Sequence, residues 1–210
     1  RGEPATVVVH GLAGSIDDTR PFASGVTGTR WFVHLRGHGG TGSPDTPWTY
    51  AGLALEVAAV AAATGASRGV GVSMGAGALL SLAVSEPGRL DRLVLVLPAS
   101  VDRAGAGRTP SAAHAIADAI DGEDLGALTT LLAEELPQPP DAAMLAWVGR
   151  RSRRLLGGAV SRGFRELMLD APVTDRHALA AVDVPVLVIG ADGDPVHPAQ
   201  VARELAEALP

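Results

Sequence analysis

Cysteine is absent from this chain of 210 residues, which excludes a disulfide framework, a thiolate metal site and a cysteine nucleophile. Lysine is absent as well, so the glycine-rich stretch at residues 71–77 lacks the lysine of a phosphate-binding loop, and its glycine spacing does not fit a dinucleotide fingerprint. Aromatic residues make up only 3%, so the core must be built from Ala, Val and Leu. No apolar run approaches the ~18 residues that span a bilayer, and no signal-peptide pattern is visible.

The residues that are present indicate a globular protein. Apolar residues make up 47%, enough for a large core in one domain. The formal net charge of −6 argues against a nucleic-acid surface. We therefore expect no nucleic-acid or membrane partner. We also expect a cytoplasmic protein, and its oligomeric state stays open.

Strands and helices alternate along most of the chain. Short runs of β-branched and aliphatic residues predict buried strands at residues 5–10, 31–35, 69–72, 93–97 and 184–189. Longer segments between and after them predict helices at residues 17–23, 50–64, 74–85 and 198–209. This alternation predicts an α/β fold with a mostly parallel sheet flanked by helices.

One interval breaks the alternation. Residues 99–183 contain no clear strand, and their helical stretches lie at residues 112–120, 126–136, 142–154 and 162–169. We therefore expect a helical cap inserted at residues 99–183. The core would then be one discontinuous domain made of residues 1–98 and 184–210.

A serine stands where one predicted strand becomes a helix. Ser73 is the centre of the string GVSMG, with small residues two positions before and after it. A serine there must occupy a tight, strained turn that exposes its hydroxyl and directs the first helical N–H groups at the atom it attacks. The context favours a nucleophile; the alternative is a serine that only caps the helix.

Three more motifs follow predicted strands, and they are HGLAG at residues 10–14, LRGHG at residues 35–39 and GADGDPVHP at residues 190–198. With the serine turn and the helical insertion, they resemble the motifs of the α/β-hydrolase superfamily over nearly the whole chain. The serine turn and its helix are similar to those of enol-lactone hydrolases and small carboxylesterases. The resemblance implies a core that lacks the family's first two strands and its last strand and helix.

The resemblance also implies roles for individual residues. Ser73 would be the nucleophile, which needs a neighbouring base because a free serine hydroxyl is weakly nucleophilic near neutral pH. The backbone N–H groups of Leu12 and Met74 would form the oxyanion hole. We expect the side chain of His10 to be structural.

The acid that orients the base has three candidates. Asp194 fits the family spacing best, and Asp192 is a close alternative, although both could simply be turn formers. Asp102, after the fourth predicted strand, is a more remote option.

None of the six histidines stands where the resemblance places the base. The family's histidine follows a further strand beyond the acid, whereas this chain ends at Pro210. We expect His197, three residues after Asp194, to be a rim residue. The catalytic histidine is thus expected beyond Pro210, and the chain by itself is expected to turn over little substrate.

The predicted cap would roof the site and set its specificity. Trp147, Phe164 and Met168 are candidates for an apolar substrate pocket, although side chains at helical spacing more often pack within the cap itself. The arginines at residues 150–165 have two interpretations as well. They form a solvated helix face, or one of them enters the site and pairs with an anionic substrate.

The sequence predicts a serine hydrolase that forms an acyl-enzyme on an ester, lactone or thioester of a small metabolite. C–C bond hydrolases and cofactor-free haloperoxidases of the same fold have a similar triad, and a non-catalytic small-molecule-binding protein is a further alternative. We expect no organic cofactor. We also expect no metal ion, because the histidines are scattered and no carboxylate cluster has ligand spacing.

Overall fold

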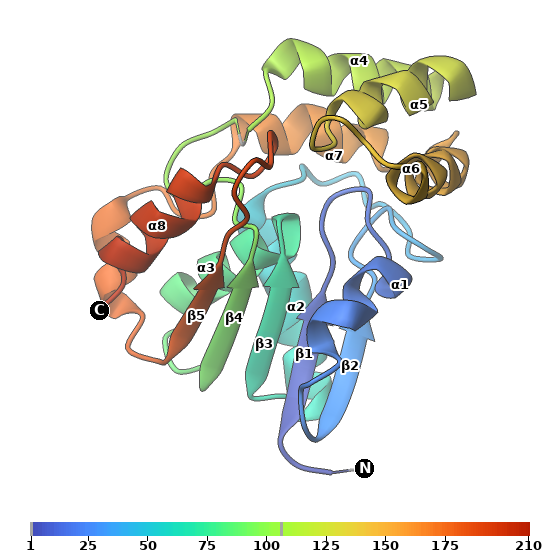
Figure 1. Cartoon of the computed structure of the whole chain (residues 1–210). Coiled ribbons are helices and arrows are strands. Elements are labelled where there is room, and N and C mark those ends of the chain that lie inside the picture. Colours follow the sequence, from blue (N-terminus) through green and yellow to red (C-terminus); the bar gives the residue numbers. More distant parts are fainter. Residues whose placement is uncertain (1, 106) are drawn as a thin grey trace.

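The computed structural model describes residues 2–105 and 107–210. Arg1, in the predicted core, and Ala106, in the predicted cap, lie outside the described residues. The centre of the fold is a five-stranded sheet in the order β2-β1-β3-β4-β5, and all four pairings are parallel (Figure 1). The strands are β1 (Ala5–Val9), β2 (Thr29–Val33), β3 (Arg68–Val72), β4 (Arg92–Val96) and β5 (Val186–Ile189). The predicted fold class is confirmed.

Helices flank both faces of the sheet, although Leu187 and Ile189 of β5 remain exposed. Alternate side chains of each strand point to opposite faces. One face packs against α2 (Tyr50–Thr64), α3 (Met74–Ser85) and α8 (Ala199–Ala208) and forms the main core. On the other face, α1 (Ile16–Thr19) and the following 3-10 turn η1 (Arg20–Ala23) lie in front of β1 and β2 (Figure 1). The predicted bounds of the helices at residues 50–64 and 74–85 match the structure.

Further helices lie beyond the carboxyl ends of the strands (Figure 1). They are α4 (Pro110–Asp121), α5 (Leu125–Glu134), α6 (Ala142–Leu155) and α7 (Ser161–Glu166), which continues into η2 (Leu167–Leu169). Helix α4 contacts α5 and α7, and α5 contacts α6. The turn η3 (Arg176–Ala181) then leads back to α3 and α8. The division of the chain into a core and a cap at residues 99–183 stays a prediction.

An ion pair between the buried Arg36 and the partly buried Glu56 joins the segment after β2 to α2. Arg36 is only 7% exposed, and both its backbone N–H and its guanidinium donate to the carboxylate of Glu56. The guanidinium also donates to the Pro47 carbonyl at 3.1 Å. This pair holds the turn at residues 35–39 against the helix.

Replacing Glu56 with glutamine should therefore destabilise the protein. The amide carries no charge, so Arg36 would stay buried without a counterion, and we expect the free energy of unfolding to fall by about 3 kcal/mol. Urea unfolding followed by circular dichroism measures this. The exposed Glu207 of α8 is the matched control, and Glu207→Gln should change stability by less than about 0.5 kcal/mol. Equal effects of the two substitutions would contradict the prediction.

Candidate active site

Ser73 occupies a strained turn between β3 and α3. Its φ of 52° and ψ of −112° lie outside the regions that side chains prefer, which costs about 1–3 kcal/mol. Two glycines make the turn possible. A Cβ on Gly71 would lie 2.4 Å from the carbonyl oxygen of Gly75, and a Cβ on Gly75 would lie 2.4 Å from the carbonyl oxygen of Val9. The backbone N–H of Ser73 donates to the Val96 carbonyl at 2.9 Å, which fixes the turn at the carboxyl end of the sheet.

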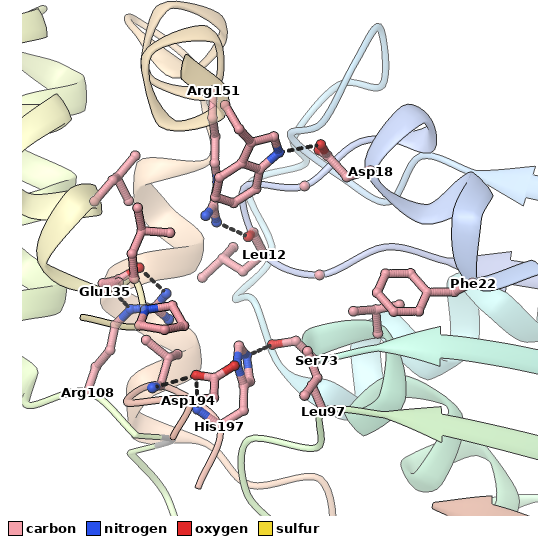
Figure 2. A pocket seen from close by; sticks show the side chains of 18 residues that line it. Leu12, Asp18, Phe22, Ser73, Leu97, Arg108, Glu135, Arg151, Asp194 and His197 are labelled. Atoms are coloured by element: carbon pink, nitrogen blue, oxygen red, sulfur yellow. Dashed lines mark hydrogen bonds and ion pairs between the residues drawn. The ribbon is translucent and has the colours of Figure 1, made fainter. Parts of the chain in front are cut away.

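The side chains of Ser73, His197 and Asp194 form a chain of hydrogen bonds (Figure 2). The Oγ of Ser73 lies 2.9 Å from Nε2 of His197, and Nδ1 of His197 lies 2.9 Å from Oδ2 of Asp194. A carboxylate only accepts, so Nδ1 carries the proton and Nε2 of a neutral ring is free to accept the serine proton. Chemically, this is a hydroxyl beside a base that an acid orients.

The turn after β5 brings Asp194 and His197 together. Oδ1 of Asp194 accepts the backbone N–H groups of Val196 at 2.8 Å and His197 at 2.9 Å, which is an Asx-turn. Partial burial alone would raise the pKa of Asp194, but the hydrogen bonds from the His197 ring and these N–H groups outweigh it and lower the pKa to about 2. The carboxylate is therefore ionised at neutral pH.

The position of His197 differs from the sequence-based expectation of a rim residue. Its ring contacts both Asp194 and Ser73. The turn after β5 brings His197 to Asp194, and the parallel sheet brings this turn next to Ser73 at the end of β3. The signal in the sequence was the spacing of Asp194 and His197, because an Asx-turn returns the residue three positions later to the same carboxylate.

The other two acid candidates lie elsewhere. The side chain of Asp192 is 86% exposed and pairs with Arg203 at 3.0 Å. Asp102 pairs with Arg176 at 2.9 Å. Of the three candidates, the structure brings Asp194 to the histidine.

The two backbone N–H groups expected to bind an oxyanion flank Ser73. Gly11 lies against the serine, since a Cβ on Gly11 would be 3.2 Å from the Cβ of Ser73. Leu12 follows Gly11, and Met74 follows Ser73 as the first residue of α3. Among residues 2–105 and 107–210, neither N–H has a hydrogen-bond acceptor. Their role in binding an oxyanion stays a prediction.

Two buried histidines link the turn that carries Leu12 to the turn at residues 35–39. His38 Nε2 accepts the backbone N–H of Ala13 at 2.9 Å, and His10 Nε2 accepts that of Leu35 at 3.2 Å. The rings lie 4.4 Å apart between their centroids. Burial lowers the pKa of His10 to about 4. Burial and the nearby His10 together lower the pKa of His38 to about 3. Both rings are therefore neutral acceptors at pH 7, in agreement with the structural role expected for His10.

Ser73 opens into a cavity of about 260 Å³ between the sheet and the helices above it (Figure 2). Trp147 lines this cavity, as the sequence suggested. Phe164 and Met168 do not line it. Phe164 is fully buried beneath the guanidinium of Arg108, and Met168 is 4% exposed. Phe164 thus packs within the predicted cap, which was the alternative interpretation, and Met168 is buried away from the cavity.

Comparison with known proteins gives the family of this chain. The profile of the alpha/beta hydrolase fold matches residues 4–210. The chain belongs to this family. A search of curated proteins gave no match.

Solved structures show the same fold. The α/β hydrolase described here is similar to the enol-lactonase from Burkholderia xenovorans LB400, with 19% identity, a TM-score of 0.80, and coverage of 100% of this chain and 80% of that one. It is also similar to a hydrolase from Pseudomonas aeruginosa PA01, with 23% identity, a TM-score of 0.78, and coverage of 99% of this chain and 78% of that one. A third similar structure is that of Est816, described as an N-acyl homoserine lactone degrading enzyme. Its identity is 21%, its TM-score is 0.74, and the match covers 100% of this chain and 83% of that one. At these identities the likeness concerns the fold.

Two further features of this α/β hydrolase concern membranes and metals. None of the helices in the described residues is long and apolar enough to cross a membrane. Within the same part of the chain, no three His, Asp or Glu side chains are grouped so that they could hold a metal ion.

Proposed function

We propose that this α/β hydrolase is a serine hydrolase that forms an acyl-enzyme and cleaves an ester, lactone or thioester of a small metabolite. The observation that carries the proposal is the hydrogen-bonded chain from Ser73 through His197 to Asp194 at the wall of a cavity. In this proposal His197 takes the place of the histidine that the sequence led us to expect beyond Pro210.

The proposed reaction begins at the serine hydroxyl. Oγ of Ser73 attacks the carbonyl carbon while its proton moves to Nε2 of His197, and Asp194 stabilises the resulting imidazolium. The N–H groups of Leu12 and Met74 donate to the oxyanion. His197 then gives the proton to the leaving oxygen or sulfur, and the carbonyl re-forms as the acyl-enzyme. Water attacks the acyl-enzyme with His197 as the base, which releases the acid and restores Ser73.

The cavity favours a small substrate. About 260 Å³ is near the lower end of the range for ligand pockets. Its lining is mostly apolar, from side chains such as Leu12, Val72, Leu97 and Leu132, with a few charged groups. The similarity to an enol-lactonase and to an N-acyl homoserine lactone degrading enzyme supports a lactone as one member of this substrate class.

A fluorophosphonate probe tests the proposed nucleophile. We expect stable modification of the chain at Ser73, located by peptide mass spectrometry, because such probes trap an activated serine. Ser73→Ala should abolish labelling, whereas replacement of the exposed Ser111 by alanine should leave it unchanged. A folded protein that binds a small ligand but is not labelled would contradict the proposal and favour a binding protein of the same fold.

A further inference from the structure

One arginine of the predicted cap reaches into the cavity that Ser73 lines. Arg151 lies on α6 and forms part of the cavity wall; in the view of Figure 2, Leu12 lies between it and Ser73. Its Nη2 donates to the Leu12 carbonyl at 3.0 Å and its Nε donates to the Ala13 carbonyl at 3.2 Å. Its guanidinium carbon lies 4.9 Å from the centroid of the Trp147 ring. These contacts fix the position of the guanidinium.

Two carboxylates near Arg151, those of Glu135 and Asp18, influence its charge but hydrogen-bond to other groups. Both oxygens of Glu135 accept from Arg108, the other arginine of the cavity wall. Asp18 accepts from the Trp147 indole and from Arg154. Within the described residues, no carboxylate lies within 4 Å of the Arg151 guanidinium, whose two acceptors are neutral carbonyls.

The guanidinium is also largely removed from solvent. Burial, followed by the nearby charge of Arg108, lowers the pKa of Arg151 to about 10, so the group remains a cation at neutral pH. A guanidinium has five N–H donors, of which the carbonyls of Leu12 and Ala13 take two. The remaining donors have no acceptor among the described residues.

We propose that Arg151 is a binding residue for a carboxylate on the substrate. This inference rests on the proposed function, because it places the carboxylate in the same cavity as the ester or lactone carbonyl that Ser73 attacks. A carboxylate accepts from two N–H groups of one guanidinium and would neutralise a charge that is costly to keep in an apolar wall. The substrates would then be monoesters of small dicarboxylic acids, or lactones and thioesters that carry a carboxylate.

A purely structural role for Arg151 predicts a different outcome. If the side chain only holds the carbonyls of Leu12 and Ala13 in place, its loss would disturb the turn that carries the Leu12 N–H. The rates of hydrolysis of neutral and anionic substrates would then fall by the same factor. The readout is therefore a ratio for two esters of equal length, each corrected for spontaneous hydrolysis. It is kcat/KM for the anionic 4-nitrophenyl hydrogen glutarate divided by kcat/KM for the neutral 4-nitrophenyl pentanoate.

We expect Arg151→Gln to lower this ratio by about 10- to 100-fold, the effect of losing a charged hydrogen bond. Arg151→Lys keeps the charge and should retain a larger ratio than Arg151→Gln. The exposed Arg150, next to Arg151 on α6, is the matched control, and Arg150→Gln should leave the ratio within about twofold of the unchanged protein. An equal loss of activity on both esters in Arg151→Gln would overturn the proposal.

A binding measurement separates this inference from the proposed function. The Ser73→Ala protein cannot form an acyl-enzyme, and its affinity for monomethyl glutarate and dimethyl glutarate is measured by calorimetry. We expect the monoanion to bind about tenfold more tightly, and Arg151→Gln in the Ser73→Ala background to remove this preference. The preference would support the subsite even if the protein hydrolysed neither ester. Its absence, or its survival in the Arg151→Gln variant, would overturn the subsite whatever the activity.

Discussion

Replacing His197 with alanine should lower kcat/KM for a neutral aryl ester by about 10⁴- to 10⁶-fold. The reason is the single hydrogen bond of 2.9 Å between Nε2 of His197 and Oγ of Ser73, since no other histidine ring contacts the serine in the part of the chain that the structure describes. Without it the hydroxyl keeps its proton and attacks slowly. Hydrolysis of 4-nitrophenyl butyrate, followed by the absorbance of the released nitrophenolate, measures the loss.

The double variant gives a sharper form of this test. Residues that act as one unit have non-additive effects, so Ser73→Ala with His197→Ala should be no slower than either single variant. The control is the exposed His177. Its Nδ1 lies 2.9 Å from a carboxylate oxygen of Asp175, just as Nδ1 of His197 lies 2.9 Å from Asp194. His177→Ala should leave the rate unchanged. Undiminished activity in His197→Ala would show that the base is another group, as the sequence first led us to expect.

Acid should destabilise the protein strongly through His10 and His38. Their pKa values of about 4 and 3 lie below the ordinary value of 6.5, so the unfolded chain binds protons that the folded chain does not. The stability is fully present above pH 6.5 and is lost as the pH falls toward those folded values. Each histidine contributes up to about 1.4 kcal/mol per pH unit, so we expect a loss approaching about 5 kcal/mol between pH 6.5 and 4.5.

Urea unfolding at a series of pH values measures this loss. His38→Gln offers the Ala13 N–H an amide oxygen in place of Nε2 and removes one titrating group, so the slope of stability against pH should fall by about 1.4 kcal/mol per unit in this window. The exposed His177 again supplies the control, and His177→Gln should keep the original slope. Asp194, with its pKa lowered to about 2, adds a loss only at lower pH. An unchanged slope in His38→Gln would show that acid acts through other groups.

Local patterns were sufficient for most of the fold. The helix predicted at residues 50–64 begins after the N-cap Thr49 and ends at Gly65, which has a left-handed conformation. The helix predicted at residues 74–85 begins after the strained turn at Ser73. The parallel sheet followed from strands separated by helices. The turn at Ser73 was predictable because a strand, a small residue on each side and a helix leave the chain little freedom.

Side-chain contacts between distant segments were not predictable in the same way. Ser73 and His197 are 124 positions apart, and nothing near either residue states their separation in space. The sequence favoured Asp194 over Asp192 but left both open, because only the fold shows which of the two carboxylates faces His197 after β5. The candidate residues Trp147 and Phe164 both fit an apolar pocket by type, and only packing placed one at the cavity and the other in the interior.

The sequence by itself determined the order of strands and helices, the strained serine and the short list of acids, because those features depend on neighbours along the chain. Only the tertiary structure decided which histidine meets the serine, which carboxylate meets that histidine and which arginine lines the cavity with carbonyl groups as its hydrogen-bond acceptors. The physical reason is that hydrogen bonds and ion pairs depend on distances of about 3 Å, and the packing of the whole molecule sets those distances.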